Sequence, residues 1–88
     1  MNQSTDSVKF LGVDVAKDTL QLFSRTLKVP AQIENTPKAI AAWLKALGRH
    51  HSQLHIACES TGGYENALLR ACWKVGVRVS RLNPARVR

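Results

Sequence analysis

The sequence predicts a single domain of the mixed α/β class. Three observations support this prediction: 88 residues suit one domain, residues 8–15 form a nearly continuous apolar run, and two later stretches repeat apolar residues at helical spacing. Apolar residues make up 44% of the chain and charged residues 22%, a balance typical of chains that fold. We therefore expect strands and helices around one core, preceded by a polar, disordered tail over residues 1–7.

Three strands are expected first. Residues 8–15 are predicted to form a strand that is covered on both faces, because the run is nearly continuously apolar. Residues 19–24 alternate and contain β-branched and aromatic side chains, which favours a second strand. Residues 27–33 form a third extended segment. Pro30 restricts it to an edge of the sheet, because proline has no N–H to donate.

The next stretch predicts a helix and then a strand. Asn35 or Thr36 can cap the helix, Pro37 suits its first position, and the helical pattern continues until Gly48. Residues 54–59 are a short apolar run, which predicts a fourth strand. The apolar face of the helix consists of Ile40, Trp43, Leu44 and Leu47.

A second helix and a fifth strand complete the predicted domain. The helix is expected from about residue 63 to residue 75, where Gly76 provides a left-handed stop, and the strand at residues 77–82. The Asn-Pro pair at 83–84 is typical of the start of another helix, only a few residues before the sequence ends. We therefore expect residues 8–88 to be a truncated domain, the front part of a longer protein.

The order β-β-β-α-β-α-β predicts a mixed sheet. Strands joined by short turns pair antiparallel, whereas strands reached through a helix pair in parallel. Placing residues 8–15 beside residues 54–59 brings the C-terminal ends of both strands together, at the edge where open α/β sheets bind ligands. We also expect an uncovered apolar face that includes parts of Val77, Val79 and Leu82, and homo-oligomers that cover it.

Two carboxylates are expected at that edge. Asp14 and Glu59 each end an apolar strand, and a divalent metal ion is the natural partner of two neighbouring carboxylates. Mg²⁺ fits best, because it binds through one or two carboxylates, keeps several waters and orients phosphate oxygens, and Mn²⁺ is the alternative ion. The alternative is that both acids serve only turn chemistry. Asp18 lies beyond the first strand and is expected to be a turn residue.

Positive charge is concentrated in the last quarter of the chain. Residues 1–65 carry a net charge of +1, whereas residues 66–88 carry +6 and contain no acid. This distribution indicates a polyanionic partner, nucleic acid before a membrane surface, and the alternative is an ordinary solvated surface. The cations expected to contact nucleic acid are Arg78, Arg81, Arg86 and Arg88.

The small residues before the second helix also suit an anion. At Thr61, Gly62 and Gly63, backbone N–H groups and the positive end of the helix can approach a phosphate. An ordinary capped turn that needs glycines explains the same residues equally well. The aromatic residues expected to pack rather than to contact bases are Tyr64, Trp43 and Trp73.

The two cysteines are expected to be buried thiols. No basic and apolar leader and no membrane-spanning run is present in the sequence, so we expect a cytoplasmic protein in which Cys58 and Cys72 stay reduced. Zinc binding by His50, His51, His55 and Cys58 is not expected. His55 and Cys58 are expected to point to opposite faces of their strand, so they could not bind the same ion.

Three stretches together support a family resemblance. They are GVDVAKDTLQL at 12–22, ENTPKAIAAWLKAL at 34–47 and ACESTGGYENALLRACWKVGVRVSRLNPARVR at 57–88. With them the chain resembles the N-terminal part of the DEDD family of insertion-sequence transposases, the insertion-sequence one-ten group that also includes Piv-type DNA invertases. The third stretch is the most specific, because it combines an acid, a glycine pair, a tyrosine and an Asn-Pro-x-x-Val run.

The resemblance implies an RNase H-like, RuvC-like fold with four metal-binding acids. Asp14 matches the first acid and Glu59 the second, so both are expected to be catalytic ligands of Mg²⁺ or Mn²⁺ in DNA strand cleavage and exchange. The resemblance also implies an aspartate pair and a second domain beyond residue 88. The fragment alone is therefore expected to be inactive and to bind metal weakly. Its expected partner is DNA or a guide RNA.

Two other functions remain open from the sequence. Actin-like and Hsp70-like ATPases also begin with a strand that ends in Asp, followed by a turn that cradles phosphate. That turn here contains Val15, Ala16 and Lys17, which offer fewer glycine or hydroxyl residues than is usual. The other interpretation is a noncatalytic nucleic-acid-binding module, in which Asp14 would be replaceable without loss of activity.

Overall fold

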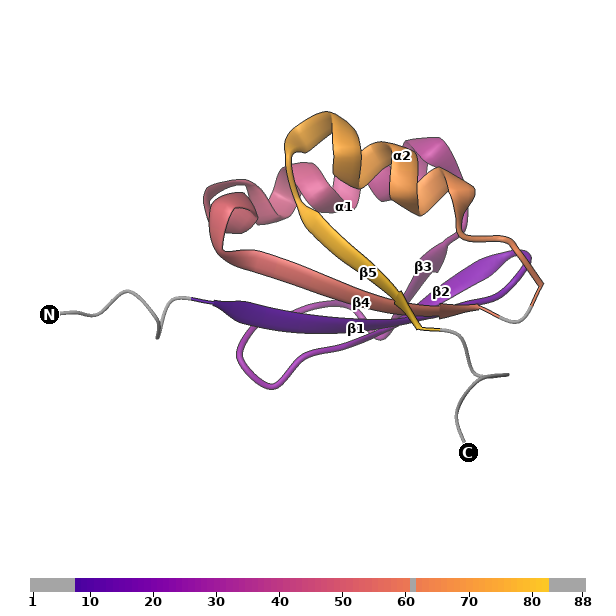
Figure 1. Ribbon diagram of the computed structural model, residues 1–88, viewed down its shortest axis with the longest axis horizontal. Helices are drawn as coiled ribbons and strands as arrows, with labels where there is room; N and C mark the ends of the chain where they lie inside the picture. The colour runs from indigo at the N-terminus through magenta and orange to yellow at the C-terminus, as the bar shows by residue number, and fades with distance from the viewer. Residues whose placement is uncertain (1–7, 61, 83–88) are drawn as a thin grey trace, which may run out of the picture.

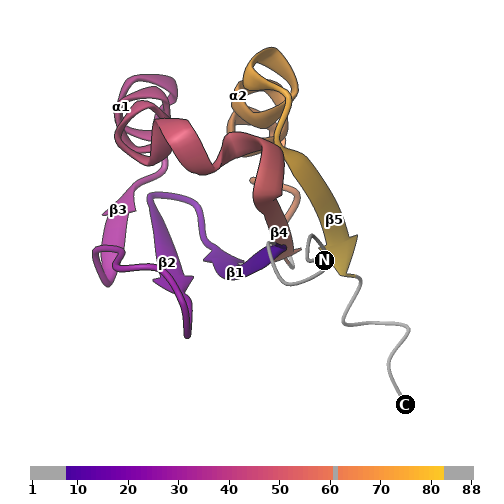
Figure 2. The same ribbon diagram turned by 90° about the vertical axis from the view of Figure 1, so that its left-hand side faces the viewer.

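A mixed sheet with two α-helices on one face forms the structure (Figures 1 and 2). The computed structural model describes residues 8–60 and 62–82. Within these residues the element order is the predicted one, with a short 3₁₀ helix added after the first α-helix. The elements are β1 (Lys9–Val15), β2 (Thr19–Phe23), β3 (Gln32–Glu34), α1 (Pro37–Leu47), the 3₁₀ helix η2 (Gly48–Gln53), β4 (Leu54–Ser60), α2 (Asn66–Val75) and β5 (Arg78–Leu82).

The sheet has the strand order β3-β2-β1-β4-β5. β1 pairs antiparallel with β2, and β2 pairs antiparallel with β3. β1 pairs in parallel with β4, and β4 pairs in parallel with β5. Both predictions about pairing are therefore confirmed: the first three strands form an antiparallel meander, and the strands reached through helices are parallel.

Local sequence signals determine the ends of the helices. Thr36 caps α1, because its Oγ1 accepts a hydrogen bond of 3.1 Å from the backbone N–H of Ala39, and Pro37 occupies the first turn. α2 ends at Gly76, which adopts a left-handed backbone with φ of 77°. The N–H of Val77 then donates a hydrogen bond to the carbonyl of Cys72. Such a bond is typical of helix ends, where it provides a partner for a carbonyl of the last turn.

The hydrophobic core lies between the helices and one face of the sheet. Alternate residues of the strands point into it, and both free cysteines lie there, as predicted. The core includes Leu11, Val13 and Val15 of β1, Leu20 and Leu22 of β2, Leu54, Ile56 and Cys58 of β4, Ile40, Trp43, Leu44 and Leu47 of α1, and Leu68 and Cys72 of α2.

No described helix covers the opposite face of the sheet, which we call the open face (Figure 2). The prediction that residues 8–15 are covered on both faces is therefore wrong. Phe10 and Gly12 make the run look continuously apolar, but they occupy outward positions, and Phe10 is 64% exposed. Phe23 lies over Gly12, where a Cβ would meet its ring at 3.6 Å.

Two predicted element boundaries are also wrong. The third strand is limited to Gln32–Glu34, because the Oγ of Ser24 accepts hydrogen bonds from the N–H groups of Thr26 and Leu27 and turns the chain. Its predicted position at an edge is confirmed. The second helix begins at Asn66 rather than near residue 63, because Gly63 is left-handed with φ of 77°.

Several side chains lie elsewhere than predicted. Val77 is 4% exposed and Val79 packs against the core, so neither belongs to an uncovered face, whereas Leu82 is exposed. Trp43 is buried as predicted, but Trp73 is 84% exposed, because it lies one position beyond the helical stripe that faces the sheet. Tyr64 is also exposed rather than packed in the core.

Two expected segments lie outside the described residues. They are the disordered tail at residues 1–7 and the helix start at residues 83–84. Among the described residues, no helix is both long enough and apolar enough to cross a membrane.

Replacing Leu68 by alanine is expected to lower the free energy of unfolding by about 2–5 kcal/mol, because this side chain is fully buried against the sheet and its truncation leaves a cavity. Leu82→Ala is the matched control. It should cost less than about 1 kcal/mol, because Leu82 lies half exposed at the end of β5. Urea unfolding measures both values, and equal losses would contradict the burial of Leu68 between α2 and the sheet.

Candidate metal-binding site

The parallel pairing of β1 with β4 brings Asp14 and Glu59 together. The two residues are register partners, near the C-terminal ends of their strands. Both are exposed and occupy positions of the open face, since their neighbours Val13 and Cys58 point into the core. Adjacent strands lie about 4.8 Å apart, so the two carboxylates project side by side.

The surroundings leave this carboxylate pair available to a ligand. On the open face the pair is flanked by Gln21 of β2 and Leu82 of β5, which are the next partners in the same row across the sheet. Neither Asp14 nor Glu59 forms an ion pair with any residue in the described ranges. Two adjacent like charges without a cation repel, which makes a divalent cation a favourable partner.

The donor set fits a magnesium-type ion with few protein ligands. Within residues 8–60 and 62–82, no cluster of three or more His, Cys, Asp or Glu side chains is arranged to hold a metal ion. Asp14 and Glu59 therefore offer two carboxylate groups, and water or substrate oxygens would complete the coordination. Mg²⁺ accepts this arrangement, because it commonly binds through one or two carboxylates and retains several waters.

Asn35 ties together the two turns beside the carboxylate pair. Its Nδ2 donates hydrogen bonds to the carbonyl of Ala16, at 2.8 Å, and to the carbonyl of Tyr64, at 3.0 Å. Ala16 follows β1 and Tyr64 lies in the turn after β4, so a single side chain holds both strand ends in place. The sequence suggests Asn35 only as a helix cap, because nothing in it signals contacts so distant along the chain.

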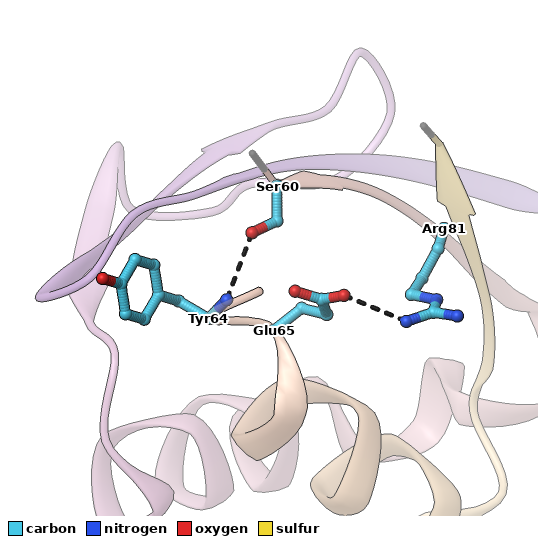
Figure 3. Close-up of polar contacts among 4 residues, drawn as sticks. All are labelled: Ser60, Tyr64, Glu65 and Arg81. Carbon is cyan, nitrogen blue, oxygen red and sulfur yellow. Dashed lines mark hydrogen bonds and ion pairs between the residues drawn. The ribbon is translucent and has the colours of Figure 1, made fainter. Parts of the chain in front are cut away.

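On the helical side of the same edge, Glu65 is buried and paired (Figure 3). Its Oε2 accepts a hydrogen bond of 3.1 Å from Nη1 of Arg81, while Glu65 as a whole is only 8% exposed. Its own backbone N–H lowers the pKa of the Glu65 carboxyl below 4.5, and Arg81 and Ser60 act in the same direction against burial. The sequence alone indicates no role for Glu65, since a glutamate after Tyr64 looks like an ordinary helix start.

Glu65 also changes the interpretation of the glycine-containing turn. A carboxylate of the chain itself already lies at the N-terminal end of α2, where the sequence suggests an external phosphate. The Oγ of Ser60 accepts a hydrogen bond of 3.3 Å from the N–H of Tyr64, and a Cβ on Gly62 would collide with the Tyr64 ring. The contacts favour a structural turn. Gly63 is exposed, and Thr61 lies outside the described residues.

The two predicted nucleic-acid-binding cations within the described residues, Arg78 and Arg81, lie on different faces of the sheet. Arg78 lies on the open face, where it is the register partner of His55 on β4. Arg81 is one of the residues that line a polar cavity of about 290 Å³ on the helical side, and it pairs there with Glu65. Arg86 and Arg88 lie outside the described residues.

The two cysteines and His55 show the environments expected of structural residues. Burial raises the pKa of the Cys72 thiol to about 12, and burial followed by the charge of Glu65 raises the pKa of Cys58, so neither favours a nucleophilic thiolate. His55 stacks on Phe10 with ring centroids 5.6 Å apart, and its Nε2 lies 2.8 Å from Oγ of Ser80. His55 and Cys58 lie on opposite faces of β4, as predicted.

No model of a known protein family matches the chain, and a comparison with curated proteins also finds no match.

Acidification is expected to weaken the fold through Glu65. Because the pKa of this carboxyl lies below 4.5 in the folded state, its stabilising contribution is complete above that value and is lost as the pH falls through the folded pKa. Urea unfolding across this range should therefore show a decline that is shallower in Glu65→Gln. Glu34→Gln, at an exposed position on β3, should keep the full decline. Identical profiles for all three proteins would contradict the stabilising role of Glu65.

Proposed function

We propose that this chain is the front part of the metal-dependent catalytic domain of a DNA transposase or recombinase with an RNase H-like, RuvC-like fold. The observation that carries the proposal is the register pairing of Asp14 with Glu59 on adjacent parallel strands. Two exposed carboxylates at the C-terminal edge of an α/β sheet, without a paired cation among the described residues, suit a divalent metal ion.

Two further observations support the proposal. The three stretches that resemble the insertion-sequence one-ten group contain both carboxylates, at positions that match the first two acids of that family. The mixed sheet of the structure, with the element order β-β-β-α-β-α-β, is compatible with the RNase H-like fold that the resemblance implies. The resemblance identifies Asp14 and Glu59 as matching acids, and the structure adds that these two residues are register partners.

The chemistry assigned to the site is phosphodiester cleavage and exchange. Bound Mg²⁺ or Mn²⁺ would activate the attacking water or hydroxyl and stabilise the leaving oxygen. Asp14 and Glu59 would hold the ion from one side, and Asn35 would maintain the positions of the two strand ends. Asp14 and Glu59 are both exposed on the open face, which leaves them accessible to a large substrate such as DNA. A domain with two of the four acids that the resemblance implies would be inactive.

Arg78 is the described residue that best suits contact with the phosphate backbone. It lies on the open face, as the carboxylate pair does. Along β5 it precedes Leu82, the register partner of Glu59, by four residues. The strand rise predicts a separation of about 13 Å along β5, a distance that a nucleic-acid backbone spans readily. The partner would be DNA or a guide RNA, since both present phosphates.

Weak metal binding through the carboxylate pair is the first expected result. Mn²⁺ should broaden the NMR signals of β1 and β4 near Asp14 and Glu59, and calorimetry should detect only weak Mg²⁺ binding. Asp14→Asn and Glu59→Gln should each abolish the broadening, because two carboxylates share one ion. Asp18→Asn is the matched control in the neighbouring turn and should retain it. Broadening that persists in Asp14→Asn would place the metal elsewhere.

Nucleic-acid binding should depend on salt. Affinity for duplex DNA should fall steeply as salt rises, and Arg78→Ala should reduce the slope by about one, because one phosphate contact is lost. Arg81→Ala should reduce it less, since Glu65 already pairs with its guanidinium. Arg25→Ala, an exposed position between β2 and β3, is the control and should leave the slope unchanged. Equal slopes for Arg78→Ala and the unmodified chain would contradict a contact on the open face.

A further inference from the structure

An apolar groove runs between α1 and α2 on the side of the molecule away from the carboxylate pair. Its volume is about 550 Å³, and its lining is mainly apolar. Ala41 and Leu44 contribute from α1, and Ala67, Ala71 and Val75 contribute from α2. Val75 is 42% exposed, so part of this apolar surface faces water. We call this feature the helical groove.

The charged residues along the helical groove are all positive. Lys45 of α1 and Arg70 and Lys74 of α2 line it, and all three are exposed. Neither helix contains an aspartate or glutamate. Within the described part of the chain, none of these three cations forms an ion pair. The groove therefore combines an apolar floor with an uncompensated basic rim.

These two properties together point to one kind of occupant. A duplex nucleic acid presents charged phosphates at its surface and would leave the apolar floor unfilled, whereas an amphipathic helix with acidic flanks matches both floor and rim. α1 and α2 contain 11 and 10 residues. Their length of about 16 Å accommodates three turns of a helix packed beside them.

We propose that the helical groove binds an acidic amphipathic helix of a partner protein, with apolar side chains on the floor and acidic side chains against Lys45, Arg70 and Lys74. The two helices that form this surface cover one face of the sheet (Figure 1), and Asp14 and Glu59 are exposed on the other. The interaction surface is therefore independent of the metal chemistry proposed above, and it would let the domain recruit a protein while the open face contacts nucleic acid.

The test measures binding of a fluorescent peptide to the full chain. The peptide is a designed helix with a leucine stripe flanked by glutamates, and a second peptide replaces the leucines by serine. Arg70→Glu/Lys74→Glu should weaken binding of the leucine peptide by about tenfold, because two favourable charge contacts become repulsive. Arg25→Glu/Lys28→Glu has the same charge change at exposed sites outside the groove and should bind the leucine peptide as the unmodified chain does. Circular dichroism verifies that both variants fold.

Four results would overturn the proposal. The first is no saturable binding of the leucine peptide, and the second is equal weakening by the two double variants, which would show general charge attraction. The third is equally tight binding of the serine peptide, because the apolar floor would then have no role. The fourth combines two observations. The unmodified chain does not bind the leucine peptide, and Arg70→Glu/Lys74→Glu loses binding to a DNA duplex or to phosphatidylserine vesicles. That result would assign the groove to nucleic acid or to a membrane surface instead.

Discussion

The parallel pairing of β1 with β4 is the constraint on which the rest of the structure depends. These two strands are the centre of the sheet, with β2 and β3 on one side and β5 on the other. Their alternate side chains form the floor of the core on one face and place Asp14 beside Glu59 on the other. Because side chains alternate along a strand, a shift of one residue in either strand would move a carboxylate into the core. Packing and site geometry are therefore determined by the same register.

Two glutamates near the end of β4 show how environment separates chemical roles. Glu59 projects from the open face without a partner among the described residues, whereas Glu65 is buried six positions later and held by Arg81. The ion pair between the buried Glu65 and the exposed Arg81 joins the start of α2 to the end of β5 and stabilises the edge of the sheet. Glu59 and Asp14 contribute no such contact and repel each other. Two carboxylates that repel each other at the edge of a sheet are expected where the residues are retained for function rather than for stability.

The strands, the helices and the parallel direction of the two strands that contain the carboxylates could be predicted from the sequence, because local signals and the element order determine them. Thr36, Pro37 and Gly76 mark helix ends through backbone chemistry that needs no tertiary context. The element order predicts that the strands containing Asp14 and Glu59 run parallel, because a helical crossover requires parallel strands. That these two strands are neighbours is an assumption at the sequence level, and the register of β1 with β4 confirms it.

The contacts that hold the site together could not be predicted in this way. Asn35 reaches across the fold to Ala16 and Tyr64, and the burial of Glu65 depends on where Arg81 returns on β5. The exposure of Phe10 and Trp73 cannot be predicted from the sequence either, because an apolar residue type does not indicate whether its side chain faces the core or the solvent. Such features depend on tertiary position rather than on residue type or spacing.

The most direct test of the account is a double-mutant cycle between Asp14→Asn and Glu59→Gln, measured by urea unfolding with and without Mg²⁺. If the carboxylates are neighbours, each single change should stabilise the metal-free protein by about 0.2–1 kcal/mol, because it removes one repulsive interaction. The double variant should gain no more than either single variant, and Mg²⁺ should reduce the advantage of all three. Additive gains that Mg²⁺ does not alter would show that the two carboxylates do not interact, and would contradict a shared metal site.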